Sequence, residues 1–199
     1  MEALWPEQGP APLANRLSVL LSTVRSVLDP GKRHDQDHFV GADKNAVWLD
    51  RANLSIDVEE FLEVAEDALV LYRAGERAAL SRLTTAEAAY TGDFLEEDAY
   101  EDWTVALREE ARATYTAVAR ALADDAAARG DVDATTRYSL RVLERDPYDE
   151  PAHLGLVAAL DRAGRHGEAR RRFRAYCARM DEIGVESAPF PAPQSHPEL

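Results

Sequence analysis

The sequence between Tyr115 and Met180 contains two copies of a helix-pair repeat, and this duplication constrains the fold more than any other feature. Gly130 is followed 34 residues later by Gly164 in a similar setting. A glycine tolerates the left-handed conformation that ends a helix. Five positions after each glycine stands a small residue, Thr135 or Ala169, which lets the next helix pack closely. The spacing therefore predicts two stacked helix pairs.

A period of 34 residues is typical of tetratricopeptide-like repeats, in which each unit is a pair of helices. Pro147 separates the two units, because proline cannot continue a helix. Two units cannot cover their own ends, so neighbouring helices must close the stack. We predict a mostly α fold, a tetratricopeptide-like helical repeat stack with a small N-terminal helix plus β-hairpin.

The spacing of apolar residues predicts where the other elements lie. An amphipathic helix is expected over 13–28, closed by Asp29-Pro30-Gly31, followed by a hairpin with strands at 37–40 and 46–49. The remaining helices are expected over 57–74, 79–90, 103–129, 132–145, 150–162 and 167–183. Four prolines after Val185 predict an extended or disordered tail over 186–199.

Charge is distributed unevenly along the chain. The net charge of -14 disfavours nonspecific affinity for nucleic acid over the whole chain. Residues 1–55 hold six Lys or Arg and seven Asp or Glu, whereas the rest holds 17 and 30. The first quarter of the chain therefore repels DNA phosphates least.

Several classes of function are disfavoured by the sequence. The single cysteine, Cys177, excludes an internal disulfide and is expected to be a small core residue rather than a nucleophile. His34 and His38 could be metal ligands, but they lie in a loop without a zinc-type framework. No Gly-rich phosphate loop, signal peptide or bilayer-length apolar run occurs. We expect a cytoplasmic protein that is not an enzyme and needs no cofactor or metal.

The order and spacing of several short strings resemble one family, the SARP-type bacterial regulators. The strings are Leu4-Trp5-Pro6, Asn15-Arg16-Leu17, Asp57-Val58-Glu59-Glu60-Phe61, Gly92-Asp93-Phe94-Leu95, Tyr100-Glu101-Asp102-Trp103, Leu107-Arg108-Glu109-Glu110, Arg129-Gly130-Asp131, Asp146-Pro147-Tyr148-Asp149-Glu150 and Tyr176-Cys177. Members of this family carry an OmpR-like winged helix followed by the bacterial transcriptional activator domain, which has a tetratricopeptide-like fold. The resemblance implies three segments: a partial winged helix over 1–55, an activator domain over 56–185 and the tail over 186–199.

For the first segment, the resemblance implies a recognition-type helix over 13–28 and a wing formed by the hairpin. The residues expected to contact DNA in the complete protein are Asn15, Arg16, Ser22, Arg25 and Lys44. The helix departs from the family in being poor in cations, because Ser18, Thr23 and Ser26 stand where arginine is common. A helix covered by solvent or by a partner is the competing interpretation.

For the repeats, the resemblance implies a transcription regulator whose stack mediates self-association or contact with a protein such as an RNA polymerase component. The apolar stripe of the helix over 13–28 separately predicts a homodimer or an N-terminal segment docked on the repeats. The expected lining of its concave surface is Arg112, Tyr115, His153, Leu154 and Val157. The arginines between Arg170 and Arg179 could dock an acidic partner or DNA phosphates, or form a solvated helix face. The alternative function is a DNA-independent tetratricopeptide adaptor that uses its N-terminal segment for docking or dimerisation.

Overall fold

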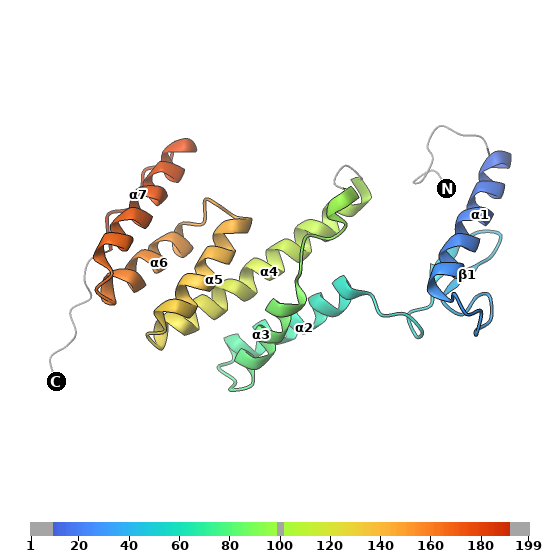
Figure 1. Ribbon diagram of the computed structural model, residues 1–199, viewed down its shortest axis with the longest axis horizontal. Coiled ribbons are helices and arrows are strands. Elements are labelled where there is room, and N and C mark those ends of the chain that lie inside the picture. The colour runs from blue at the N-terminus through green and yellow to red at the C-terminus, as the bar shows by residue number, and fades with distance from the viewer. Residues whose placement is uncertain (1–9, 99–101, 192–199) are drawn as a thin grey trace. The chain divides into compact units, whose positions relative to one another are not determined.

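The computed structural model describes residues 10–98 and 102–191, and the chain divides into two units, Met1–Ile56 and Asp57–Leu199 (Figure 1). Leu4-Trp5-Pro6, Tyr100 and residues 192–199, which entered the predictions above, lie outside the described residues. The boundary between the units falls one residue after the predicted end of the first segment.

The first unit consists of one helix and one hairpin. Helix α1 spans Pro10–Leu28, and strands β1 (Val40–Ala42) and β2 (Val47–Leu49) pair antiparallel. Gly41 lies opposite Trp48, and a Cβ atom on Gly41 would come within 2.3 Å of the indole ring. Glycine is therefore required for this side chain to lie over the partner strand.

The second unit is a stack of six helices, each packed on the next (Figure 1). They are α2 (Asp57–Arg73), α3 (Ala79–Ala89), α4 (Asp102–Ala128), α5 (Val132–Arg145), α6 (Glu150–Arg162) and α7 (His166–Glu182), with a short 3-10 turn at Glu96–Asp98. The long α4 also packs on α2 and α6, so it joins the first helix pair to the last. The mostly α repeat stack with an N-terminal hairpin is confirmed.

The duplicated unit folds the same way in both copies. Gly130 and Gly164 have φ values of 72° and 74°, the left-handed conformation expected at the end of a helix. In each copy the residue after the glycine donates its backbone N–H to the carbonyl five residues earlier, at 2.9 Å. Thr135 and Ala169 are 2% and 0% exposed, so the small residues do allow close packing between helices.

An aspartate begins each of two helices of the stack, α5 and α6. Asp131 accepts a hydrogen bond from the backbone N–H of Ala134, and Asp149 accepts one from Ala152. The second carboxylate oxygen of Asp149 accepts a hydrogen bond from Nε of Arg120 at 2.6 Å. Because the Asp149 side chain is fully buried, this ion pair fixes the start of α6 against α4.

The structure describes the first six residues of the predicted tail. Residues 186–191 are extended, as the prolines predict, but they are packed on the last helix pair. The backbone N–H of Ala188 donates to the hydroxyl of Tyr176 at 2.7 Å, and Phe190 contacts Phe173. An open end of the repeat stack offers apolar surface, and this segment covers part of it.

Candidate functional site

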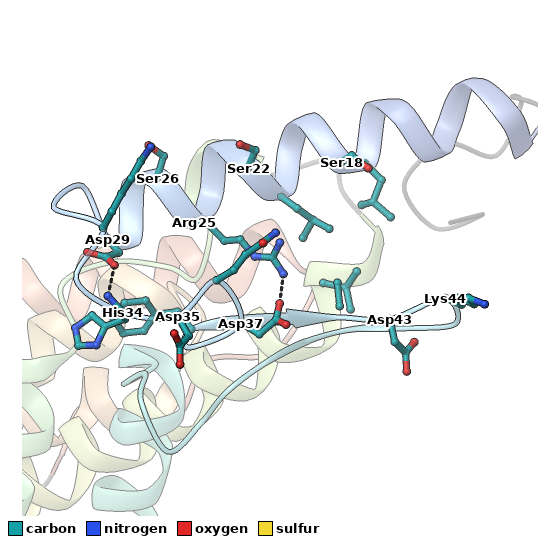
Figure 2. A pocket seen from close by; sticks show the side chains of 17 residues that line it. Ser18, Ser22, Arg25, Ser26, Asp29, His34, Asp35, Asp37, Asp43 and Lys44 are labelled. Carbon is teal, nitrogen blue, oxygen red and sulfur yellow. Dashed lines mark hydrogen bonds and ion pairs between the residues drawn. The ribbon is translucent and has the colours of Figure 1, made fainter.

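An open hollow of about 930 Å³ lies between α1 and the hairpin (Figure 2). The helix lines it with Ser18, Ser22 and Ser26, which are four residues apart and therefore on one face. Lys44, in the turn that joins the strands, lines the hairpin side. The hollow thus combines a row of hydroxyl groups with a cation, the kinds of side chain that contact phosphate oxygens.

Arg25 connects the helix to the hairpin across this hollow (Figure 2). Its Nε and Nη2 atoms donate to the carbonyl oxygen of Val40 at 3.0 and 2.8 Å, and Nη2 also donates to Asp37 at 2.5 Å. Only 16% of its side chain is exposed. The guanidinium is therefore engaged within the unit, and its role is to hold the hairpin against α1 rather than to offer a free cation.

Acidic residues in the lining are mostly used to build turns. The backbone N–H groups of Arg33 and His34 donate to Asp29 and lower the pKa of its carboxyl group. The N–H groups of Asn45 and Ala46 do the same for Asp43. Asp37 is paired with Arg25. Within the described part of the chain, the charged side chains that line the hollow without an ion pair or a turn contact are Lys32, Lys44 and Asp35.

The residues expected to contact DNA occupy different settings. Asn15, Arg16 and Ser22 are exposed on α1, and Lys44 is exposed on the turn. Ser22, Lys44 and Arg25 all line the hollow, whereas Asn15 and Arg16 lie outside its lining. Ser18, Ser26 and Lys32 line the hollow as well but were not expected to contact DNA. The four-residue spacing of the serines could have revealed this row.

Apolar side chains on the first unit remain in contact with solvent. Val19 and Val27 of α1 are 65% and 73% exposed. The whole of β2, from Val47 to Leu49, is also exposed. Several large apolar side chains exposed on a small unit favour contact with another protein surface.

The residues expected to line a concave protein-binding surface are largely in the core. Tyr115, His153 and Val157 are 5%, 8% and 0% exposed. Nε2 of His153 lies 3.0 Å from the carbonyl oxygen of Pro147, which fixes the ring inside the stack. Leu154 is half-buried, so the accessible part of this set is Leu154 together with Arg112.

Arg112 and Tyr115 belong to a polar and aromatic cluster centred on Asp93. The Tyr90 hydroxyl donates to Asp93 at 2.7 Å, Arg145 lies 3.3 Å away, and Arg112 donates to the other carboxylate oxygen. The rings of Tyr90 and Tyr115 stack at 4.3 Å, with the Arg145 guanidinium over both. This cluster links α4 and α5 to the turn before α4.

Asp93 is held in its charged form by these partners. Burial alone would raise its pKa, but the hydrogen bonds from Arg112 and Tyr90 and the nearby positive charges outweigh burial and lower the pKa. Burial, together with the hydrogen bond to Asp93, raises the pKa of Tyr90. The cluster therefore holds α4 and α5 to the turn before α4, and the positive charges of Arg112 and Arg145 compensate the buried charge of Asp93.

The histidines of the 34–38 loop and Cys177, the residues weighed as metal ligands or as a nucleophile, pack against neighbouring side chains. His34 and His38 stack on each other with ring centroids 4.1 Å apart, and both contact Phe39. Among residues 10–98 and 102–191, no group of three or more His, Cys, Asp or Glu side chains could hold a metal ion. Cys177 is half-buried on α7. In the same two ranges, no helix has the length and apolar character to cross a membrane.

Comparison with known proteins supports the fold described above. The chain is similar to EmbR of Mycobacterium tuberculosis in a structure of its complex with a low-affinity phosphopeptide, with a TM-score of 0.68 and 22% sequence identity. The match covers 95% of this chain and 50% of that chain, so this chain spans about half the length of EmbR. No protein with a curated description matches the sequence. Residues 56–190 match the family model described as the bacterial transcriptional activator domain, and the chain belongs to that family.

Proposed function

We propose that this chain is a transcription regulator in which α1 and the hairpin contribute to DNA binding in the complete protein. In this proposal the repeat stack mediates self-association or binds another protein, such as an RNA polymerase component. The match of residues 56–190 to the activator-domain family supports the general role. The observation that carries the DNA-binding part is the hollow shared by the serine row of α1 and by Lys44 of the hairpin turn.

In this proposal the first unit works as the recognition helix and wing of a winged helix. A recognition helix enters the major groove, while nearby hydroxyl and ammonium groups contact the phosphates. Ser22 and Lys44 face the hollow from its two sides and are assigned to the phosphates. Asn15 and Arg16, exposed near the start of α1, are assigned to base edges or adjacent phosphates. Arg25 keeps the two elements at a fixed separation.

Two exposed cations are assigned to DNA, Arg16 and Lys44, which makes salt dependence a direct test. Each phosphate neutralised by Lys or Arg contributes about -0.9 to the slope of log K against log salt, so Arg16 and Lys44 together give about -2. Fluorescence anisotropy with a promoter duplex, at roughly 50 and 200 mM salt, measures this slope. We expect the Arg16→Ala, Lys44→Ala double variant to bind more weakly and to lose most of the slope.

A matched control removes the same charge from the other unit. Arg73→Ala together with Arg77→Ala deletes two exposed cations of the repeat stack. This control is expected to keep the slope of the unaltered chain. Failure of the unaltered chain to bind DNA at low salt, or equal losses in both double variants, would contradict the assignment of Arg16 and Lys44.

The exposed apolar surface of the first unit favours a second candidate, a DNA-independent adaptor. Val19, Val27 and the β2 side chains would then pack on a second copy or on a partner protein. Light scattering distinguishes this function when it is combined with the DNA measurement. A dimer that does not bind DNA supports the adaptor. The adaptor hypothesis also predicts that a Val19→Ser, Val27→Ser variant is monomeric.

A further inference from the structure

The last described residues, 186–191, form an extended segment, which we call the strap. Helix α7 ends at Glu182. Gly184 follows it with a φ of 68°, and Val185 donates its backbone N–H to the carbonyl oxygen of Met180, which together mark a left-handed cap. The chain then runs back along α7. Ala188 meets Tyr176, and two residues later Phe190 meets Phe173, about one helical turn closer to the start of α7.

The strap is held by the same kinds of contact that hold an extended peptide ligand. Its backbone N–H at Ala188 donates to the hydroxyl of Tyr176, which is fully buried and itself donates to Glu150 at 3.0 Å. The Phe190 ring meets Phe173 edge-on at 5.1 Å between centroids. The Arg170 guanidinium lies 6.0 Å from the centre of the Phe190 ring.

Helix α7 also carries exposed positive charge, and one of its arginines, Arg170, contacts the strap. Arg170, Arg171 and Arg174 have no ion-pair partner among the residues that the structure describes, and all three are exposed. The chain as a whole carries a net charge of -14, so a free basic cluster is unusual on its surface. Such a cluster favours a ligand that carries carboxylates.

We propose that the strap occupies a peptide-binding groove on α6 and α7, which takes an extended peptide with a proline-flanked aromatic residue and adjacent carboxylates from a partner protein. This inference rests on the protein-binding role proposed for the repeats and names the ligand chemistry. The strap shows which backbone and aromatic contacts the groove accepts. The free arginines add the preference for acidic residues. Short Pro-flanked segments lose little entropy when they dock, which suits them to such a groove.

The strap can be displaced because few contacts hold it. One backbone hydrogen bond and four half-buried residues, of which Phe190 is the aromatic one, hold residues 186–191, and this is less than the packing of a helix in the stack. As part of the same chain, however, the strap competes at an effective concentration of the order of millimolar. A peptide added in solution is therefore expected to bind weakly until the strap is released.

The test uses the full chain and a labelled peptide with the sequence of residues 186–191, Glu-Ser-Ala-Pro-Phe-Pro. Two variants release the strap without altering the groove: Phe190→Ala removes its anchor, and Ala188→Pro removes its N–H donor. Fluorescence anisotropy is expected to show apparent affinity at least about tenfold higher in either variant, because the groove is then free in most molecules. A peptide with alanine in place of phenylalanine should not bind.

A second comparison tests the acidic preference. In the Phe190→Ala chain, a peptide with glutamate in place of serine should bind more tightly than one with glutamine there. Arg170→Gln together with Arg174→Gln should abolish that difference, whereas Arg137→Gln, an exposed arginine of α5, should not. No gain in affinity in either strap variant, with circular dichroism unchanged, would overturn the proposal and leave the strap as an end cap.

Two further measurements distinguish the proposed groove from DNA binding by the first unit and from a strap that docks on a second copy of the chain. Equal DNA affinity in the unaltered and Phe190→Ala chains is expected, so failure of the peptide test says nothing against DNA binding by the first unit. Light scattering that shows a dimer in the unaltered chain and a monomer in Phe190→Ala would assign the strap to a second copy. That result would contradict the proposed groove for a partner protein.

Discussion

Replacing Asp93 by asparagine tests whether the buried cluster holds the repeat stack together. The Asp93 side chain is 9% exposed and accepts hydrogen bonds from Tyr90 and Arg112, with Arg145 at 3.3 Å. A hydrogen bond to a charged group contributes about 1.5–3 kcal/mol. Because 38% of the Arg112 side chain and 28% of that of Arg145 are exposed, water replaces part of what they lose. We expect Asp93→Asn to lower the free energy of unfolding by about 2–3 kcal/mol.

Thermal and urea unfolding followed by circular dichroism measure this loss. For a unit of this size, each kcal/mol corresponds to about 3–5 °C in Tm, so Tm should fall by roughly 6–15 °C. Asp133→Asn is a matched control, because Asp133 also pairs with an arginine, Arg165, at 3.3 Å but has a side chain that is 93% exposed. The control should change stability by less than about 0.5 kcal/mol.

The dependence of the loss on pH provides an independent check. The pKa of Asp93 is lowered in the folded state, so its charge stabilises the fold fully above the ordinary value of 3.8. That stabilisation disappears as pH falls through the lowered pKa. The difference between the unaltered chain and Asp93→Asn should therefore be constant from about pH 5 to 7 and shrink below about pH 3.8. Equal stability of Asp93→Asn and Asp133→Asn at pH 7 would refute the structural role of the cluster.

Other substitutions test the helix caps and the link between helix and hairpin. Gly130→Ala should destabilise the stack by about 1 kcal/mol, because φ is 72° there. In contrast, Gly155→Ala should stabilise it by about 0.5–1 kcal/mol, because Gly155 lies inside α6 with open space around it; chemical denaturation compares the two, and a gain from Gly130→Ala would contradict the cap assignment. Arg25→Met keeps the side-chain stem but loses the bonds to Val40 and Asp37, so hairpin amides should exchange about 5- to 100-fold faster. Unchanged exchange at β1 would show that Arg25 does not hold the hairpin.

Local patterns were sufficient to predict most helices. The glycine between the two helices of each repeat, the small residue after it and the apolar spacing are properties of neighbouring residues, and they predicted the bounds of α5 and α6 to within a residue. They also fixed the mostly α class. Contacts between distant residues could not be predicted in this way. Arg145 reaches Asp93 across 52 positions, and nothing near either residue indicates the pairing.

The candidate site shows the same limit. Helical spacing placed Asn15, Arg16 and Ser22 outward, but it could not show that Arg25 turns toward the hairpin, because that depends on where β1 lies. The choice of Tyr115, His153 and Val157 as surface residues failed for a similar reason. A helix in a stack is covered on more than one side, and a single apolar stripe does not reveal the second. Prolines predicted an extended tail but not its docking on Tyr176.

Hydrogen exchange with and without promoter DNA tests the central claim most directly, which is that the first unit binds DNA while the repeats serve protein contacts. The full chain at roughly 50 mM salt is the sample, because phosphate contacts weaken steeply as salt rises. DNA should slow amide exchange in α1 and in the β1–β2 hairpin and leave α4 to α7 unchanged. Slowed exchange in α7, beside Arg170 and Arg174, with none in α1 or the hairpin, would contradict this division of roles.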